Sequence, residues 1–280
     1  MGPYPFFDWC ARGKGVRPLF VIAIAAVLAV SVTAQRRRSF GPARVDFPAN
    51  APYDGRFTLA RLKYESGPGG YYYFGLPAWA HGYGYDPVPD RGRSERNLMK
   101  ILNEISGVEP RIDDSVIVAL DDPDLCKYPV SYMTEAGYWT MTDKEAQAFH
   151  DYIAKGGFVI FDDFRDPPRG GGGWENFEAN MQRMFPGARF VDMDVSHPIF
   201  HSFFDLVSLD IVPQDYDRGR PIFRGLFEDN DPKKRLLAIA NFNTDVSNFW
   251  EFSGTGFRPV EESNEAFKLG VNYIVYGLTH

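Results

Sequence analysis

Short apolar runs alternate with amphipathic segments along most of this 280-residue chain. Residues 57–64 alternate between apolar and polar side chains and predict a first strand. The runs 115–120, 158–161 and 236–240 are continuously apolar, which is typical of parallel strands buried on both faces. A further short strand is expected at 129–133. The apolar runs therefore predict a sheet that is largely enclosed.

Helical periodicity separates these runs. Apolar residues at helical spacing follow Ser94, which predicts a helix that Ser94 caps and Gly107 ends. Thr142–Glu145 is a capping box at the start of the next helix, and further helices are expected at 174–185 and 267–278. The alternation of strands and helices predicts βαβ units, and hence an α/β fold with a doubly wound, mostly parallel sheet.

The N-terminal segment has the charge order of a secretory signal. Basic residues precede the uncharged run Leu19–Val32, and small residues follow it. The run is shorter than the roughly 20 residues that span a bilayer. We expect a cleaved signal peptide at 1–34 and a periplasmic or extracellular protein. The alternative is a membrane anchor, and contact with a membrane is expected only if the segment is not cleaved.

Residues 35–55 are basic and then rich in Pro and Ala, which predicts a linker before a domain at 56–280.

The composition narrows the classes of partner that this domain could bind. The net charge of −7 argues against non-specific binding to nucleic acid, because phosphate contacts need clustered Lys and Arg. Cleavage would remove Cys10 and leave Cys126 alone, so no intramolecular disulfide is expected. The partner is expected to be an unidentified ligand or protein of the cell envelope.

Acidic pairs follow two of the predicted strands. Asp121 and Asp122 close the first, and Asp162 and Asp163 close the second. Ligands of open α/β sheets bind outside the carboxyl ends of the strands, so these acids are candidates for a base or for binding a hard cation. The alternative is a carboxylate that caps the next helix or pairs with Arg165. Both interpretations of each pair remain open at this point.

His197 is the third candidate catalytic residue. It lies in a loop before Pro198, where it could act as a general base, or else bond to the backbone. His201 follows, but no third ligand at metal spacing is evident, so no metal site is assigned. The chain lacks a phosphate-binding loop and a Gly-x-Ser-x-Gly motif, and no cofactor is expected. Cys126 is interpreted as structural.

A loop at 66–92 is rich in Gly, Tyr and Trp. Trp79 and His81, with the tyrosines around them, could form an aromatic platform that stacks on sugar rings or peptides. The alternative is a loop that folds its aromatic rings back onto the domain. Together with Tyr132 and Arg165, Trp79 and His81 make up the candidate ligand-binding set.

Several segments resemble the bacterial domain of unknown function 4159, over about residues 55–279. They are Phe57–Tyr64, Tyr128–Met133, Thr142–Glu145, Gly156–Asp163, His197–Pro198 and Gly270–Tyr276. That family is similar in fold to class I glutamine amidotransferase-like domains, so the resemblance implies a flavodoxin-like sheet. Amidotransferases carry a Cys nucleophile after a strand. The end of Phe158–Phe161 carries Asp162 and Asp163 instead, which argues against glutaminase activity.

Three functions are compatible with these patterns. The first is a non-catalytic binding or assembly domain of the envelope. The second is a hydrolase of a sugar or peptide component, with Asp162 or Asp163 and His197 as acid and base. The third is a metal-dependent enzyme. If the chain is an enzyme, these three side chains should converge in one pocket.

Overall fold

The computed structural model describes residues 47, 49–71, 75–83, 92–166, 173–213 and 219–280. The predicted signal peptide and most of the predicted linker lie outside these residues. Within the described residues, no helix is both long and apolar enough to cross a membrane.

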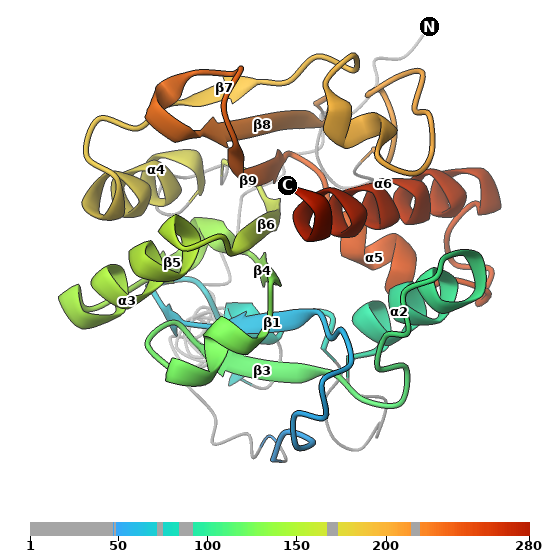
Figure 1. The fold of residues 1–280 in the computed structure, drawn as a ribbon, viewed down its shortest axis with the longest axis horizontal. Helices are drawn as coiled ribbons and strands as arrows, with labels where there is room; N and C mark the ends of the chain where they lie inside the picture. The colour runs from blue at the N-terminus through green and yellow to red at the C-terminus, as the bar shows by residue number, and fades with distance from the viewer. Residues whose placement is uncertain (1–46, 48, 72–74, 84–91, 167–172, 214–218) are drawn as a thin grey trace, which may run out of the picture. The chain divides into compact units, whose positions relative to one another are not determined.

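A seven-stranded mixed sheet forms the centre of the domain (Figure 1). Its strands, in spatial order, are β3 (Val116–Ala119), β1 (Ala60–Lys63), β4 (Val130–Thr134), β6 (Phe158–Phe164), β9 (Leu236–Phe242), β8 (Ile222–Phe227) and β7 (Phe190–Asp192). The first five are parallel, whereas β8 runs in the opposite direction and pairs antiparallel with both β9 and β7. A small second sheet pairs β2 (Glu65–Ser66) with β5 (Trp139–Thr140). The expected mostly parallel α/β sheet is thus confirmed.

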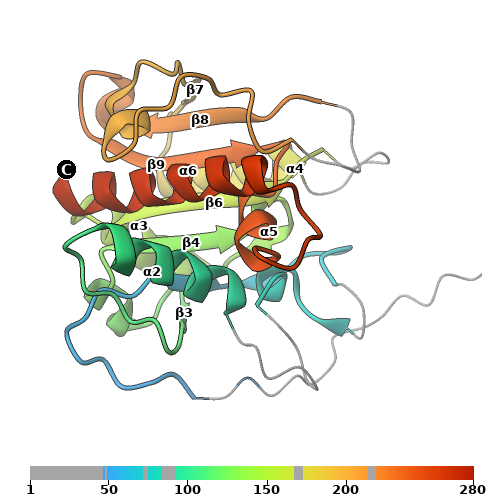
Figure 2. The same cartoon turned by 90° about the vertical axis from the view of Figure 1, so that its right-hand side faces the viewer.

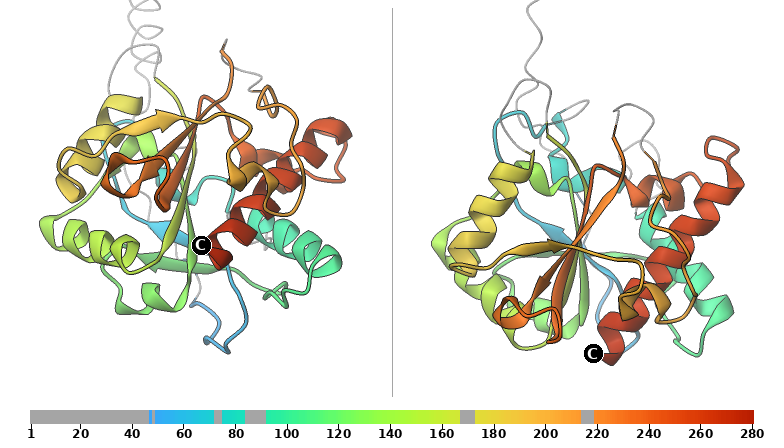
Figure 3. Two further views of the ribbon diagram at one scale, coloured as in Figure 1. Left: turned by 45° about the horizontal axis from the view of Figure 1, so that its top comes forward. Right: turned by 90° about the horizontal axis from the view of Figure 1, so that it is seen from above.

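Helices cover both faces of this sheet. On one face lie α3 (Asp143–Ala154) and α4 (Gly173–Met184), and on the other lie α2 (Arg93–Ile105), α5 (Val246–Glu251) and α6 (Val260–Thr279) (Figures 1 and 2). The view from above shows the two helical layers on either side of the strands (Figure 3). Alternate residues of β6 serve the two cores, because Ile160 packs with the α2, α5 and α6 side and Phe161 with the α3 and α4 side.

Short 3₁₀ helices complete the connections. They are η2 (Ala78–Ala80), η3 (Pro123–Lys127), η4 (Ala136–Tyr138), η5 (Pro198–His201) and η6 (Glu228–Asn230). Two of them, η2 and η4, lead into or out of the carboxyl edge of the parallel strands.

Of the two helix starts predicted from capping residues, one is confirmed and the other is not. The capping box is confirmed. Thr142 Oγ1 accepts a hydrogen bond from the Glu145 amide at 3.2 Å, and the Glu145 carboxylate accepts one from the Thr142 amide at 2.7 Å. Ser94 is not the N-cap, since α2 begins one residue before it and Gly92 takes the cap position with a φ of 59°. A side chain at Gly92 would overlap Ser115, so glycine is required there.

Part of the predicted linker packs along the domain. The side chain of Asn50 donates to the Ile117 carbonyl at 2.7 Å and accepts from the Ile117 amide at 3.0 Å, so it pairs with β3 as a neighbouring strand would. The ring of Phe47 lies 4.6 Å from that of Trp79. These contacts satisfy backbone groups on the outer edge of the sheet.

The strand order reverses at β1, which has β3 on one side and β4 on the other. Ligands of open α/β folds bind in a crevice at such a switch point, and we use the word crevice below for the carboxyl edge of the strands beside β1 and β4. Two acidic residues at this edge have left-handed backbone conformations, Glu135 after β4 (φ 52°) and Asp163 near the end of β6 (φ 55°). The Tyr64 hydroxyl donates to the carbonyls of Thr134 and Glu135 and so fixes the turn after β4.

The turn after Glu135 depends on close contact between two glycines. An added Cβ at Gly137 would lie 2.7 Å from the backbone nitrogen of Gly173, at the start of α4. Gly137→Ala should therefore lower the free energy of unfolding by about 1–3 kcal/mol, measured by urea denaturation. Gly107→Ala is the control, because nothing lies within 4 Å of a Cβ there. Equal stabilities of the two variants would contradict the tight contact.

Candidate functional site

Three side chains from separate segments meet at the crevice. His81 Nδ1 lies 2.5 Å from Asp163 Oδ2 and 3.6 Å from Glu135 Oε1. One ligand atom from each of the three residues lies within 4.8 Å of the others. His81 follows η2, Glu135 follows β4, and Asp163 lies on β6. The fold thus brings one imidazole and two carboxylates together at the carboxyl edge of the sheet.

Asp163 is fully buried, yet only one of its oxygens has a partner. Oδ2 contacts His81 and accepts a longer bond from Thr134 Oγ1 at 3.4 Å. Oδ1 has no hydrogen-bond partner among the described residues. A buried acceptor without a donor costs about 1–3 kcal/mol, and more when it is charged. This oxygen therefore requires a proton, a water molecule or a ligand.

The backbone at His81 is held by a buried guanidinium. Arg61 on β1 is fully buried and donates to the carbonyls of Trp79 at 3.1 Å and His81 at 2.6 Å. Its Nε binds the carboxylate of Glu95 on α2 at 2.5 Å. Removing one partner of such a buried pair leaves an uncompensated charge and typically costs 3–5 kcal/mol. Arg61 therefore positions His81 without lying in the three-residue cluster.

Glu135 lies in the strained turn between β4 and η4. Its side chain is buried, and burial together with the Asp163 carboxylate raises its pKa well above the ordinary value, against the opposing charge of Arg165. Left-handed non-glycine residues cost of order 1–3 kcal/mol and concentrate at functional sites. The conformations of Glu135 and Asp163 thus favour a functional role at this edge.

Further carboxyl groups surround the cluster. Burial is the main cause that raises the pKa of Asp162, Asp245 and Glu251, each to about 7. Burial lowers the pKa of His81, but the Asp163 carboxylate outweighs it and the pKa rises to about 9. His81 is accordingly cationic at neutral pH. A group of perturbed acids and one base in a crevice is typical of a functional site.

Asp162 has a different environment from Asp163. It accepts hydrogen bonds from the Tyr132 hydroxyl at 2.7 Å, the Asn241 amide group at 3.1 Å and the Ser247 backbone at 3.1 Å. These partners lie on β4, β9 and α5. Asp162 and Tyr132 thus connect β4, β6, β9 and α5. Of the two predicted aspartates, only Asp163 has an oxygen without a hydrogen-bond partner.

The structure does not bring His197 together with the two aspartates. His197 Nδ1 accepts from the Ile199 amide, and its ring lies 6.0 Å from that of Tyr276. The Tyr276 ring in turn packs against Phe158, the first residue of β6. His197 is therefore near the amino edge of the parallel strands, whereas Asp163 is near the carboxyl edge.

The candidate ligand-binding residues also separate. His81 joins Asp163, and Arg165 acts electrostatically on Glu135. Trp79 is buried against Phe47, and it contributes its carbonyl to Arg61. Of the other aromatic residues proposed for a platform, Tyr83 is buried, whereas Tyr72, Tyr73 and Tyr85 lie outside the described residues.

The acidic pair after β3 has structural partners. Asp121 binds Lys144 at 2.7 Å, and Asp122 caps η3 by accepting from the Asp124 amide at 2.9 Å. The helix-capping and ion-pair interpretation thus fits this strand end, and the pair provides matched controls for the aspartates of β6.

Sequence reasoning missed Glu135, Asp245 and Glu251. Glu135 comes directly after β4, and Asp245 follows β9 and caps α5 by accepting from the Asn248 amide. The rule that selected the pairs after β3 and β6, acids at the carboxyl ends of strands, would have found both. Glu251 lies at the end of α5, and no strand-end signal marks it.

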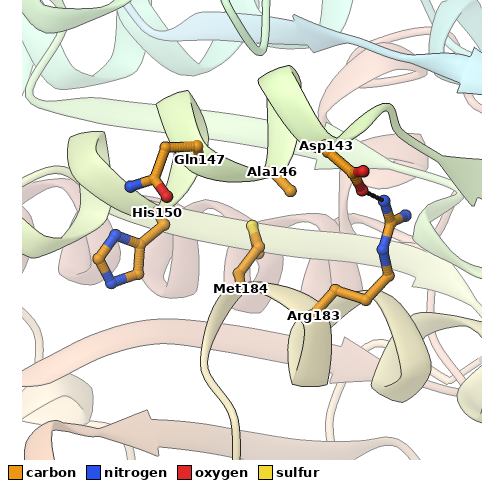
Figure 4. A pocket seen from close by; sticks show the side chains of 6 residues that line it. All are labelled: Asp143, Ala146, Gln147, His150, Arg183 and Met184. Carbon is orange, nitrogen blue, oxygen red and sulfur yellow. Dashed lines mark hydrogen bonds and ion pairs between the residues drawn. The ribbon is translucent and has the colours of Figure 1, made fainter.

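A separate cavity of about 310 Å³ lies between α3 and α4 (Figure 4). Asp143 and Arg183 pair across its mouth at 2.7 Å. The other lining residues are Ala146, Gln147, His150 and Met184. None of these lining side chains holds a buried polar atom without a partner. The crevice at His81 is therefore the stronger candidate site.

A family profile described as "Domain of unknown function (DUF4159)" matches residues 59–278. The chain belongs to this family. A search among curated proteins gave no match. The matched span includes His81, Glu135 and Asp163, so the site described above lies inside the DUF4159 domain.

The raised pKa of Glu251 has a measurable consequence for stability. Its folded-state pKa of about 7 exceeds the ordinary 4.5, so this carboxyl favours the folded state below pH 4.5 and loses that contribution as the pH rises to 7. Glu251→Gln should reduce the fall in the free energy of unfolding over this range by about 1–3 kcal/mol. Urea denaturation at several pH values measures it.

The control for this prediction is Glu178→Gln, which removes an exposed carboxylate from the surface of α4. This variant should keep the pH dependence of the unmodified chain. If the free energy of unfolding of Glu251→Gln has the same pH dependence as that of Glu178→Gln, the pKa of Glu251 is not raised by burial.

Proposed function

We propose that this chain is an exported hydrolase of the cell envelope whose active site contains His81, Glu135 and Asp163. The observation that supports it most is the contact of His81 with Asp163 at 2.5 Å beside a fully buried carboxylate oxygen that lacks a partner. The position of the pair at the carboxyl edge of the parallel strands adds support, because ligands of such folds bind outside that edge. The N-terminal charge pattern supports export.

The chemistry of the site suits the activation of water. Hydrolysis needs a group that holds a water molecule beside the substrate and accepts its proton. The unpartnered Oδ1 of Asp163 is a hydrogen-bond acceptor, and Glu135 supplies a second carboxyl group in the same cluster. The His81 side chain is 34% exposed, so the imidazole of the cluster is accessible to solvent.

We further propose a flavodoxin-like class for the sheet, in line with the resemblance to class I glutamine amidotransferase-like domains. Numbered along the chain, the five parallel strands follow the order 2-1-3-4-5, which flavodoxin-like folds use. Cys126, the cysteine within the described residues, is exposed on η3 and is not among the cluster residues. The proposed reaction is accordingly hydrolysis without a thiol nucleophile.

The second candidate is a non-catalytic binding domain of the envelope. The hydrogen bonding of Asp162 favours it, since that acid is occupied by protein donors and serves the framework. A binding domain would use the same crevice and release its ligand unchanged. Product formation therefore separates the two functions.

Asp163→Asn tests the proposal, because asparagine tolerates the left-handed backbone of this position. The full-length chain is incubated with purified peptidoglycan and with chromogenic ester, amide and glycoside substrates, and product release is measured by chromatography and absorbance. The variant should lose at least about 100-fold of the rate, the usual contribution of a general base.

The matched control is Asp121→Asn, which changes an acid after β3, another parallel strand of the same sheet, and should keep the full rate. Wild-type rates in Asp163→Asn would place the activity elsewhere in the chain. Retention of the unmodified chain on peptidoglycan without any product would favour the binding domain.

A further inference from the structure

We propose that His81, Glu135 and Asp163 bind a divalent transition-metal cation. The role of the cation in activating water rests on the proposed hydrolase, whereas its binding can be tested alone. One imidazole nitrogen and two carboxylate oxygens lie within 4.8 Å of one another. Ligands at about 2.0–2.2 Å from a zinc ion are roughly 3–3.5 Å apart, so small side-chain movements would complete the site.

The unpartnered oxygens are an independent observation that points to a cation. Asp163 Oδ1 and Asp245 Oδ2 are both buried and have no hydrogen-bond donor among the described residues. Asp163 is 0% exposed and Asp245 is 4% exposed. Because the two acids interact electrostatically with each other and with His81, both oxygens belong to the same charged region.

The charges around the crevice also favour a cation. The carboxyl groups of Asp162 and Glu251 add to those of Glu135, Asp163 and Asp245, and all five interact electrostatically with at least one other member of this group. The opposing positive groups are Arg61, Arg93 and Arg165, because the imidazole of His81 would lose its proton on binding the metal. Arg61 is already paired with Glu95, so its charge is compensated outside the cluster.

The donor set indicates the class of metal. Magnesium and calcium prefer oxygen ligands alone, whereas an imidazole with carboxylates suits zinc or manganese. Three protein ligands leave coordination positions open for water, as in catalytic rather than structural zinc sites. A water molecule bound there would be acidic enough to lose a proton near neutral pH.

The structure also describes how the ligands would be held. Arg61 fixes the backbone of His81, and Tyr64 fixes the backbone of Glu135 through its hydroxyl. Asp163 is held by its strand and by the hydrogen bond from Thr134. Such supporting contacts orient ligands in metal sites, and their loss typically costs 10–100-fold in metal affinity.

The experiment is metal titration of the full-length chain after treatment with EDTA. Zn²⁺, Mn²⁺, Mg²⁺ and Ca²⁺ are each titrated by calorimetry, and the melting temperature is followed in parallel. We expect one site that binds Zn²⁺ or Mn²⁺ at least about tenfold more tightly than Mg²⁺ or Ca²⁺, with a rise in melting temperature. Each of His81→Gln, Glu135→Gln and Asp163→Asn should weaken binding at least about tenfold.

His150→Gln is the matched control for His81→Gln. His150 contacts Asp151 at 3.1 Å and has a side chain that is 35% exposed, against 34% for His81, but it lies on α3 away from the crevice. It should leave the affinity unchanged. Equal affinities of the unmodified chain and a folded His81→Gln variant, or tighter binding of Mg²⁺ or Ca²⁺, would overturn the proposal.

Failure of this inference and failure of the proposed hydrolase give different results. Zinc or manganese binding without hydrolysis would support the metal site and contradict the proposed hydrolase. If the chain binds no cation at His81 and EDTA leaves hydrolysis unchanged, the result would support the hydrolase and contradict the metal site. Circular dichroism of each variant confirms folding, and His81→Gln carries the test if a buried substitution unfolds the chain.

Discussion

The charge of Arg61 is the constraint on which the arrangement of the domain depends. A guanidinium cannot lose its proton in a protein interior, so its burial on β1 requires acceptors from every side. Glu95 supplies a carboxylate from α2, and the carbonyls of Trp79 in η2 and of His81 directly after it supply two further acceptors. One buried cation thus connects β1 to a covering helix and to the segment that carries the imidazole of the site.

Parallel strands then determine why acids gather at one edge. Because every parallel strand ends on the same side, residues far apart in sequence, such as Glu135, Asp163 and Asp245, come within electrostatic range of one another. Their mutual repulsion is not relieved by solvent, since all three are buried. Such an arrangement is unfavourable for folding alone, and carboxyl groups with perturbed pKa values that lie beside a partly exposed imidazole are typical of functional sites.

The sequence predicts the enclosed part of the fold well, because strands such as 158–161 are apolar on both faces and helix starts such as Thr142 have local chemistry. The edge strand β7 is not predicted from the sequence, because its residues are mostly exposed and lack that signature. Asp163 is predicted from its position on a strand end. For its partner, the sequence suggests His197 and assigns His81 only to an aromatic platform, because the placement of a loop relative to a strand end is a tertiary property.

The segment before the first strand has a consequence for handling the protein. The side chain of Asn50 occupies the hydrogen-bonding groups of Ile117 on the outermost parallel strand. A chain trimmed to the family span, which begins at residue 59, would lack this cover. Its sheet margin would then offer free amides and carbonyls to a second molecule, which is the usual origin of edge-to-edge aggregation. Keeping this stretch of chain, which contributes nothing to the crevice, should therefore lower the tendency of the trimmed domain to aggregate.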